Sequence, residues 1–358
     1  MKLNIEKKLF PDLELKRPII ISGPCSAETE KQTVDTAIAL SNLGIRIFRA
    51  GIWKPRTRPG MFEGVGKIGF KWLQKVKKET GMLICIEVAN KMHVRHVVDN
   101  DIDAIWIGSR TTANPFAVQE IADSLLGTKM TVLVKNPINP DINLWIGALE
   151  RLNSKGITKL AAIHRGFSVY ASSPYRNPPQ WQIPIELHRK IPNLPMLTDP
   201  SHICGTRDRL KEICQKTMDL NFDGLMIETH IEPEKSLSDT QQQITPQNLK
   251  AILDSLIIRN ENIENETNNE LNYYRKQIDL IDFQIIDLLK ERLDISNNIG
   301  NYKRDKNITI FQSARYDELL NSRINFATQL GIEKDFITNI FKSIHEESVN
   351  RQNDVMNE

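Results

Sequence analysis

The densest group of residues able to do chemistry lies between residues 45 and 60. An apolar, β-branched run there ends in Arg49. The loop that follows contains glycine and proline and carries three further cations, Lys54, Arg56 and Arg58. Guanidinium groups bind oxyanions through paired hydrogen bonds, and an ammonium adds a compact charge. The stretch therefore predicts a strand that brings cations to a site for a phosphorylated or carboxylated small molecule, although a solvated basic loop would carry the same charges.

A repeated pattern of elements could bring such residues together. Short apolar runs alternate with helix-forming stretches along the first part of the chain. Eight such units in about 250 residues have the size and rhythm of a (β/α)8 TIM barrel, with a doubly wound sheet as the alternative. The predicted strands are residues 18–22, 45–48, 82–86, 104–107, 131–134, 159–163, 195–197 and 224–227.

A polar or reactive residue follows each predicted strand. In a barrel the carboxyl ends of all strands meet on one face, so these residues would share one pocket. One set is cationic and suits a small, densely charged anion: Arg49, Arg110, Lys135 and Arg165. A second set offers a thiolate, an imidazole and two carboxylates, which suit a divalent metal without choosing among manganese, iron, cobalt and zinc: Cys25, His202, Glu228 and Asp239.

Composition narrows the class of protein. The 358 residues are 40% hydrophobic, enough for a sizeable core and two domains, and the net charge of +2 gives no bulk attraction to nucleic acid or membrane. The four cysteines lack CxxC spacing and are expected to be reduced thiols. No apolar run has the length of a signal peptide core or a membrane span, so we expect a soluble cytoplasmic protein.

Seven motifs follow one another through residues 15–250. They are Gly-Pro-Cys-Ser-Ala-Glu (23–28), Arg49 with Lys-Pro-Arg-Thr (54–57), Gly-Ser-Arg-Thr-Thr (108–112), Val-Lys-Asn (134–136), His-Arg-Gly (164–166), Asp-Pro-Ser-His (199–202), and Glu228 with Ser238 and Asp239. In type and order they resemble the motifs of the 3-deoxy-D-arabino-heptulosonate-7-phosphate (DAHP) synthases, in the compact branch related to the octulosonate-phosphate synthases. The resemblance implies a (β/α)8 barrel that condenses phosphoenolpyruvate with erythrose 4-phosphate to give DAHP and phosphate.

The resemblance also implies roles for individual residues. Phosphoenolpyruvate would be clamped by Arg49, Arg110, Lys135 and Arg165. Manganese is the expected metal, with iron, cobalt or zinc as alternatives, and it would polarise the aldehyde from a site made by Cys25, His202, Glu228 and Asp239. Erythrose 4-phosphate would be bound by Lys54, Pro55, Arg56 and Thr57, and the residues expected to take part in catalysis are Lys54, Cys25 and His202. Since the octulosonate enzymes typically carry a Lys-Ala-Asn-Arg loop, Lys-Pro-Arg-Thr favours the four-carbon sugar, and an octulosonate-phosphate synthase remains the alternative.

A different composition follows residue 258. Residues 259–270 are polar and without apolar periodicity, which predicts a linker between a domain at 1–258 and a helical domain at 271–358. Apolar residues then recur at steps of three and four as far as residue 302, except that Arg292 stands where an apolar residue is due. At about 100° per residue, Lys303 lies within roughly 20° of Arg292, whereas Arg275 points about 100° away. Two further helices are predicted at 314–330 and 334–351.

The helical pattern resembles the all-helical chorismate mutases, which are intertwined dimers. The matching substrate-binding positions are Arg275 of the partner subunit with Arg292, Lys303, Arg315, Ser348 and Gln352. Tyr316 and Gln312 depart from the acidic residues common in that family. We therefore expect a homodimer that rearranges chorismate to prephenate, and we expect prephenate or chorismate bound in the helical domain to inhibit the barrel, with prephenate as the first choice. The alternative is a helical domain that only binds chorismate or prephenate and dimerises.

Overall fold

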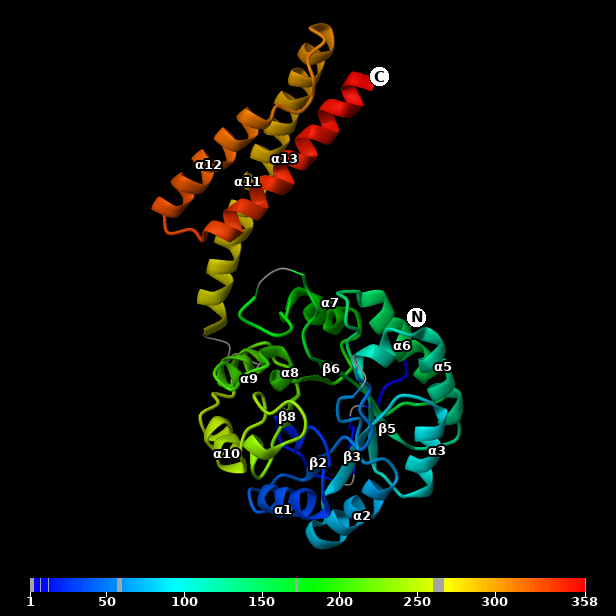
Figure 1. The fold of residues 1–358 in the computed structure, drawn as a ribbon. Coiled ribbons are helices and arrows are strands. Elements are labelled where there is room, and N and C mark those ends of the chain that lie inside the picture. Colours follow the sequence, from blue (N-terminus) through cyan, green and yellow to red (C-terminus); the bar gives the residue numbers. More distant parts are fainter. Residues whose placement is uncertain are drawn as a thin grey trace. The chain divides into compact units, whose positions relative to one another are not determined.

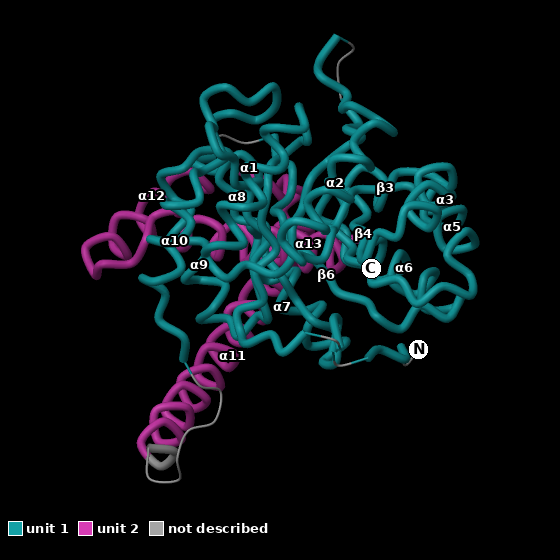
Figure 2. Tube along the Cα trace, turned by 90° about the horizontal axis from the view of Figure 1, so that it is seen from below, with its two compact units in different colours: residues 1–261 teal, residues 262–358 magenta. Residues whose placement is uncertain are grey.

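The chain forms two compact units, residues Met1–Glu261 and Asn262–Glu358 (Figures 1 and 2). The computed structural model describes residues 3–6, 8–11, 13–56, 60–170, 173–259 and 267–357, and for residues 267–269 only the backbone. The expected domain limits, 1–258 and 271–358 with a linker at 259–270, remain a prediction, because residues 260–266 lie outside the described ranges.

Unit 1 is a closed barrel of eight parallel strands surrounded by helices (Figure 1), which confirms the predicted fold. Its neighbouring strands follow chain order, and β1 closes the ring on β8. The strands are β1 (Ile19–Gly23), β2 (Ile47–Arg49), β3 (Leu83–Val88), β4 (Ala104–Ile107), β5 (Thr131–Lys135), β6 (Leu160–His164), β7 (Met196–Thr198) and β8 (Gly224–Glu228). The helices are α1 (Glu30–Ser41), α2 (Ile68–Thr80), α3 (Lys91–Asp99), α4 (Ser109–Thr112), α5 (Pro115–Ser124), α6 (Ile142–Ser154), α7 (Gln182–Lys190), α8 (Pro200–Cys204), α9 (Leu210–Asp219) and α10 (Pro246–Asp254).

Alternation along the strands separates two apolar layers. On β2, Phe48 belongs to the core that lies between strands and helices, whereas Ile47 belongs to a cluster that fills the barrel interior. Each of the seven remaining strands contributes an inward-facing residue to the same cluster as Ile47: Ile21, Cys85, Trp106, Leu133, Ile163, Leu197 and Met226. Two residues further along, the next inward position lies at the carboxyl end of its strand. This second layer is mostly polar and includes Arg49, Glu87, Lys135, Arg165, Asp199 and Glu228.

Several strands extend one residue further than the sequence predicted. β2, β5, β6 and β8 end at Arg49, Lys135, His164 and Glu228, where the prediction ended each at the preceding apolar residue. The backbone of a polar residue can continue the ladder whether its side chain faces the barrel interior, as for Arg49, Lys135 and Glu228, or packs outside it against Trp181, as for His164. Polarity is therefore a poor marker of the last strand residue here.

The N-terminal segment closes the opposite end of the barrel, a role that the sequence analysis did not predict. Leu9 and Phe10 are buried and pack in the cluster of inward-facing residues. The Thr131 hydroxyl donates to the Leu9 carbonyl at 2.9 Å. Solvent access to the barrel interior is therefore expected from the carboxyl end of the strands.

Unit 2 consists of three helices, α11 (Thr267–Asp305), α12 (Ser313–Gln329) and α13 (Lys334–Asn357), in agreement with the all-α prediction. Helix α13 packs along both α11 and α12 (Figure 1). Gly300 permits a close approach, since an added Cβ would lie 3.1 Å from Cα of Gln352 on α13. Among the described helices of both units, none is long and apolar enough to span a membrane.

Candidate active site

A cavity of about 160 Å³ opens at the carboxyl end of the strands. It brings together residues that are up to 185 positions apart, from Lys54 to Asp239 (239 − 54 = 185). Predicted residues that line it include Lys54, Arg56, Arg110, Lys135, Arg165 and His202. Thr57, also predicted to bind substrate, lies outside the described residues.

Arg49 forms the buried base of the cationic set. Its side chain is 2% exposed, and one amino group donates to Glu228 Oε1 at 3.1 Å. Its Nε and other amino group are buried and have no hydrogen-bond partner among the described residues. Buried donors are usually paired, so these two nitrogens indicate a place for an acceptor supplied by a ligand.

Asp199 connects the cationic set to the predicted metal ligands. One of its carboxylate oxygens lies 2.6 Å from Lys135 Nζ and 2.8 Å from His202 Nδ1, and the other accepts from the His202 backbone amide at 3.1 Å. Burial by itself would raise the pKa of Asp199, but the adjacent His202 and Lys135 bring it well below its usual range. Asp199 also caps helix α8, which fixes the start of the turn that carries His202.

Asp199 belongs to the Asp-Pro-Ser-His motif, but no role was predicted for it from the sequence. The signal was an Asp-Pro pair after a buried strand, which is the usual start of a helix with proline at its first position.

Arg165 lies among other cations. Its guanidinium donates to Asn177 Oδ1 at 2.7 Å. Burial lowers its pKa to about 10, and the nearby Arg176 and Arg110 act in the same direction against the charge of Asp199. A carboxylate or phosphate bound in this cavity would reduce that repulsion.

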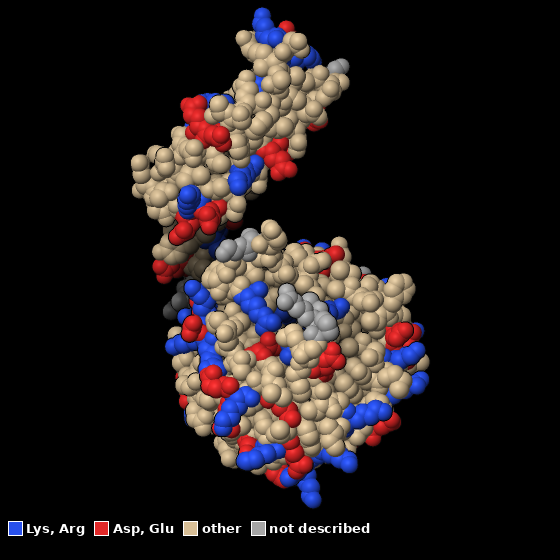
Figure 3. All heavy atoms as spheres, viewed as in Figure 1, with Lys and Arg blue, Asp and Glu red and all other residues tan. Residues whose placement is uncertain are grey.

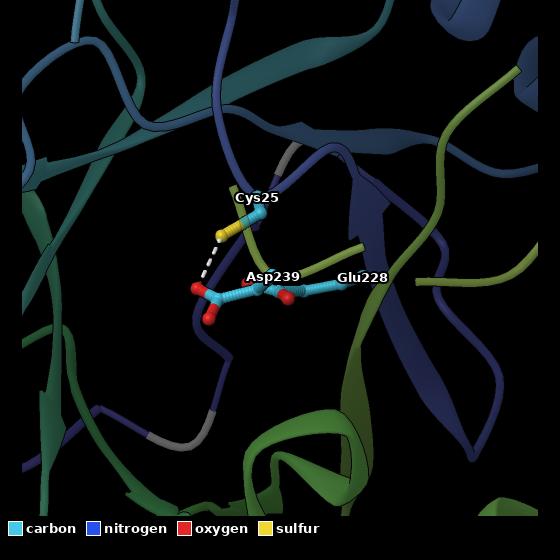
Figure 4. A group of neighbouring side chains, drawn as sticks. All are labelled: Cys25, Glu228 and Asp239. Carbon is cyan, nitrogen blue, oxygen red and sulfur yellow. Dashed lines mark hydrogen bonds between the residues drawn. The ribbon is translucent and has the colours of Figure 1, made fainter. Parts of the chain in front are cut away.

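Three of the four predicted metal ligands converge. One ligand atom each from Cys25, Glu228 and Asp239 lie within 4.8 Å of one another (Figure 4). His202 is adjacent, with its Nε2 3.8 Å from Glu228 Oε1. Burial lowers the pKa of His202, which favours the neutral ring that binds metals. One sulfur, one nitrogen and carboxylate oxygens form a donor set that suits a divalent transition ion.

The backbone at Asp239 is unusual. Its φ of 49° is in the left-handed region, which aspartate tolerates better than most residues. In this conformation Asp239 Oδ2 lies 3.2 Å from Cys25 Sγ (Figure 4). The loop is tied to the Cys25 segment because Gln243 accepts from the Cys25 amide at 2.9 Å and donates to the Ser238 carbonyl at 2.8 Å.

Lys54 lies against Cys25. Its Nζ is 2.5 Å from Cys25 Sγ and 3.0 Å from the Cys25 carbonyl oxygen. Burial, together with the Glu228 charge, raises the pKa of Cys25 to about 12, so the thiol is protonated at neutral pH in the absence of a metal. Burial alone would lower the pKa of Lys54, but the negative groups around it raise it. Lys54 is therefore a charged proton donor at the edge of the metal ligands.

Pro55 and Arg56, the other described residues of the Lys-Pro-Arg-Thr motif, lie beside the same groups. Pro55 and Arg56 line the cavity, and Arg56 lies 3.7 Å from Asp239 Oδ2. The Arg56 Nε donates to the Phe62 carbonyl at 2.9 Å, which fixes the Arg56 side chain against residue 62.

An aromatic residue that the sequence analysis did not single out lies beneath two cations. Trp106 is inward-facing and 1% exposed. The Arg49 guanidinium carbon is 4.7 Å from its ring centroid, and Lys135 Nζ is 5.7 Å from it. Both distances are within the range of cation–π attraction. No local sequence pattern separates this tryptophan from an ordinary core residue.

In unit 2, the structure brings together four of the six predicted chorismate-binding residues. Arg292 on α11 donates to the Ser348 hydroxyl on α13. Lys303 Nζ lies 2.9 Å from Gln352 Oε1 and 2.5 Å from the Ile310 carbonyl oxygen. Ser348 and Gln352 are both buried, and burial lowers the pKa of Arg292 and of Lys303. A cavity of about 320 Å³ adjoins Lys303 and Gln312.

The other two predicted residues lie apart from this cluster within the described chain. Arg315 pairs with Glu318 one turn along α12, and Arg275 contacts only its helix neighbour Asn272 among the hydrogen bonds described. The position of Arg275 agrees with the helical arithmetic, which turned it away from Arg292.

Comparison with known proteins gives two family matches. Residues 14–264 match the model described as the DAHP synthetase I family, and residues 274–353 match the one described as chorismate mutase type II. Phospho-2-dehydro-3-deoxyheptonate aldolase of Thermotoga maritima is 32% identical over 225 residues, 63% of this chain and 64% of that protein. The chain thus spans just under two thirds of the length of this relative.

Other relatives match each part separately. A 2-dehydro-3-deoxyphosphooctonate aldolase of Polaromonas sp. is 26% identical over 269 residues, 69% of this chain and 92% of that protein. The T-protein of Enterobacter agglomerans is 33% identical over 85 residues, 24% of this chain and 23% of that protein. The crystal structure of the Thermotoga maritima DAHP synthase superposes with a TM-score of 0.60 at 30% identity, covering 66% of this chain and 67% of that one.

The position of Trp106 leads to a prediction about anion binding. Trp106→Leu removes the ring face beneath Arg49 and Lys135, and a desolvated cation–π contact is worth about 2 kcal/mol. At about 1.4 kcal/mol per factor of ten, we expect the affinity for phosphoenolpyruvate, the anion that the sequence motifs predict, to fall roughly tenfold or more. Calorimetric titration of the metal-free protein would measure it.

The matched control is Trp145→Leu, which removes another fully buried indole whose Nε1 donates to the Val134 carbonyl at 3.1 Å. This variant should lower the thermal midpoint and leave the affinity for phosphoenolpyruvate within about twofold, since its ring contacts no cation of the site. Equal losses of affinity in both variants would show that Trp106 acts only through core packing.

Proposed function

The chain belongs to the DAHP synthetase I family, and on that premise we propose that it is a bifunctional enzyme of the shikimate pathway. Its barrel condenses phosphoenolpyruvate with erythrose 4-phosphate to give DAHP and phosphate, and its helical unit rearranges chorismate to prephenate. The four buried free thiols are in keeping with a reducing, cytoplasmic setting.

The single observation that carries the barrel activity is the shared cavity. Arg110, Lys135 and Arg165 line it together with Lys54 and two of the metal ligands. Phosphoenolpyruvate carries a carboxylate and a phosphate, which the cations would hold with Arg49 at the base. The aldose would then lie between this clamp and Lys54, so the enol carbon and the aldehyde carbon face each other.

A divalent ion would be held by Cys25, His202, Glu228 and Asp239. Manganese is the first choice for this ion, and iron, cobalt and zinc are the alternatives. Bound there, it would polarise the aldehyde as a Lewis acid. Lys54 would give a proton to the aldehyde oxygen as the carbon–carbon bond forms. Water then adds to the resulting cationic carbon, and phosphate leaves.

The Lys-Pro-Arg-Thr loop supports erythrose 4-phosphate as the second substrate, bound by Lys54, Pro55, Arg56 and Thr57. The greater identity to a heptonate aldolase than to an octonate aldolase agrees with this choice. The longer coverage of the octonate aldolase keeps an octulosonate-phosphate synthase as the second candidate.

In the helical unit, Arg292 and Lys303 would bind a carboxylate and the ether oxygen of chorismate, with Ser348 and Gln352 beside them. The pericyclic reaction needs no nucleophile, so positioned donors suffice. Arg275 would complete the site from the partner subunit, and Arg315 would add a further cation.

A homodimer through α11 is supported by its surface. The first half of this helix exposes large apolar side chains: Tyr273, Tyr274, Ile278, Leu280, Ile281, Phe283, Ile285, Ile286 and Leu288. Uncharged residues cover most of the visible face of unit 2 in Figure 3. Monomeric proteins rarely expose continuous apolar surface of this extent, and a second copy of the same helix would cover it. A unit that only binds chorismate and dimerises is the alternative.

The barrel activity predicts metal-dependent loss of phosphoenolpyruvate with erythrose 4-phosphate and none with arabinose 5-phosphate. Chelation should abolish the loss and manganese should restore it, because the carbonyl would lose its Lewis acid. The ultraviolet absorbance of phosphoenolpyruvate follows the reaction. Consumption with arabinose 5-phosphate alone would instead support the octulosonate-phosphate synthase.

A pair of cysteine variants tests the ligand assignment within the same assay. Cys25→Ser should lower manganese-supported activity by about 100-fold or more, since it replaces the predicted thiolate ligand. Cys214→Ala changes another buried cysteine, on α9 in the outer core, and should remain active.

The dimeric mutase site predicts complementation between two inactive variants. Arg275→Ala and Arg292→Ala should each lower kcat/KM by about 30-fold or more, since each removes a charged partner of a substrate carboxylate. In a mixed dimer one site would have both arginines intact. Co-expression of the two chains should therefore restore about a quarter of the unsubstituted activity, given random pairing in a two-fold dimer. Failure of the mixture to gain activity would contradict a site shared between subunits.

We also propose that prephenate bound in unit 2 inhibits the barrel. Saturating prephenate should lower the rate of phosphoenolpyruvate loss in the full chain, because ligand binding to one unit biases a state that both share. Arg292→Ala should remove this inhibition and retain the uninhibited rate. An unchanged rate with prephenate in the unsubstituted protein would contradict the proposal.

A further inference from the structure

Two consecutive residues between β6 and α7, Arg176 and Asn177, are held in place by backbone contacts. The Arg176 amide donates to the Cys204 carbonyl at 3.2 Å, and the Asn177 amide donates to the Ile203 carbonyl at 3.1 Å. Their position depends on a glycine in α8's terminal turn, because a Cβ on Gly205 would lie 2.5 Å from Cβ of Arg176.

A second glycine makes room for the other residue of the pair. Gly166, with φ of 76°, follows Arg165, and a Cβ there would lie 2.0 Å from the Asn177 carbonyl oxygen. Arg176 and Asn177 are therefore packed between the carboxyl end of β6 and helix α8, which carries His202.

Asn177 connects the anion-binding set to the metal-binding set. Its side-chain oxygen accepts from the Arg165 guanidinium at 2.7 Å, and its nitrogen donates to the His202 carbonyl at 2.7 Å. The residue is 7% exposed. A buried amide with both ends paired holds its two partners at a fixed separation.

Arg176 acts on the two carboxylates of the metal-binding set. Its guanidinium donates to Asp239 Oδ1 at 3.0 Å and to Gln242 Oε1 at 2.8 Å. Gln242, which is 1% exposed, in turn donates to Glu228 Oε2 at 2.6 Å. In each carboxylate the contact occupies one oxygen and orients the other. Outer-shell partners of this kind set the orientation of metal ligands.

We propose that Arg176 and Asn177 are positioning residues that fix the metal ligands relative to the phosphoenolpyruvate clamp: Arg176, through Gln242, orients Asp239 and Glu228, and Asn177 joins Arg165 to the His202 turn. The inference rests on the proposed function of the barrel. Because the Arg176 side chain is 47% exposed, its contribution is orientation of the ligands more than net ion-pair energy.

The two residues should differ in what they affect. Arg176→Ala should weaken manganese binding by about 10- to 100-fold, the usual cost of losing an outer-shell partner. It should leave phosphoenolpyruvate affinity of the metal-free protein within about threefold, since the Arg165–Asn177 contact remains. Both bonds come from one amino group of Arg176. Arg176→Lys keeps the charge but places a more flexible ammonium in place of the planar guanidinium, and should recover only part of the manganese affinity. Asn177→Ala should weaken both ligands.

The experiment measures free manganese by electron paramagnetic resonance and phosphoenolpyruvate binding by calorimetry, on the full chain. Gln242→Leu should reproduce the manganese loss, and the double variant with Arg176→Ala should lose less than the sum of the two effects, because both act on the same carboxylates. Arg209→Ala is the matched control. Arg209 is half-exposed, directly precedes α9 and contacts Glu212, so its substitution should change neither affinity.

Unchanged manganese affinity in Arg176→Ala, or parallel loss of both affinities and of the thermal midpoint, would overturn the positioning role. Failure of the unsubstituted protein to bind manganese and phosphoenolpyruvate would instead overturn the proposed function, and this inference with it.

Discussion

The ion pairs made by Asp199 and Glu228 are the interaction on which the rest of the barrel site depends. Both carboxylates are fully buried, and they neutralise Arg49 and Lys135 where no water could do so. Removing Asp199 would leave Lys135 without its carboxylate partner, and removing Glu228 would leave Arg49 with only its longer contact of 4.0 Å to Asp199. The same acids also contact or flank His202, so one set of charges holds both the anion clamp and the metal-binding residues.

This arrangement has a consequence for ligand binding. The buried charges of opposite sign nearly compensate one another before any ligand arrives, so an added cation or an added anion alone would upset the balance. A divalent ion and a substrate carrying carboxylate and phosphate bring charges of opposite sign. Residues predicted to bind each of them line the same cavity. Basic and acidic side chains are also interspersed on the visible outer face of unit 1 (Figure 3). The helical unit, by contrast, places Arg292 and Lys303 without a carboxylate among their described hydrogen bonds, so their charges are free to pair with an anionic ligand.

The sequence by itself determined the elements and the types of residue at their ends. Period-two alternation in Ile47–Arg49 and period-three-to-four alternation through α11 are local properties, because a side chain's direction follows from backbone geometry. Such periods identify the positions of Arg49 at the end of β2 and of Arg292 and Lys303 on α11, whereas Cys25 and Asp239 lie outside the strands and helices and were chosen from the family motifs. Family motifs then supplied the chemistry, whereas strand ends were misjudged by one residue because polarity and ladder bonding do not coincide.

Only the tertiary structure decided which residues support those groups. In the sequence, Trp106 cannot be distinguished from other apolar strand residues, and its role depends on the packing of β4 between β3 and β5. Three further supporting residues lie in loops without periodicity: Arg176, Asn177 and Gln242. Their partners are up to 66 positions away in the chain, as for Arg176 and Gln242. Contacts of this kind depend on how eight strands close into a ring, and loop closure leaves no local trace in sequence. The separation of Arg275 from Arg292 could be predicted from the sequence, because helical geometry directs the two side chains about 100° apart on α11. Folding of one chain leaves that separation unchanged.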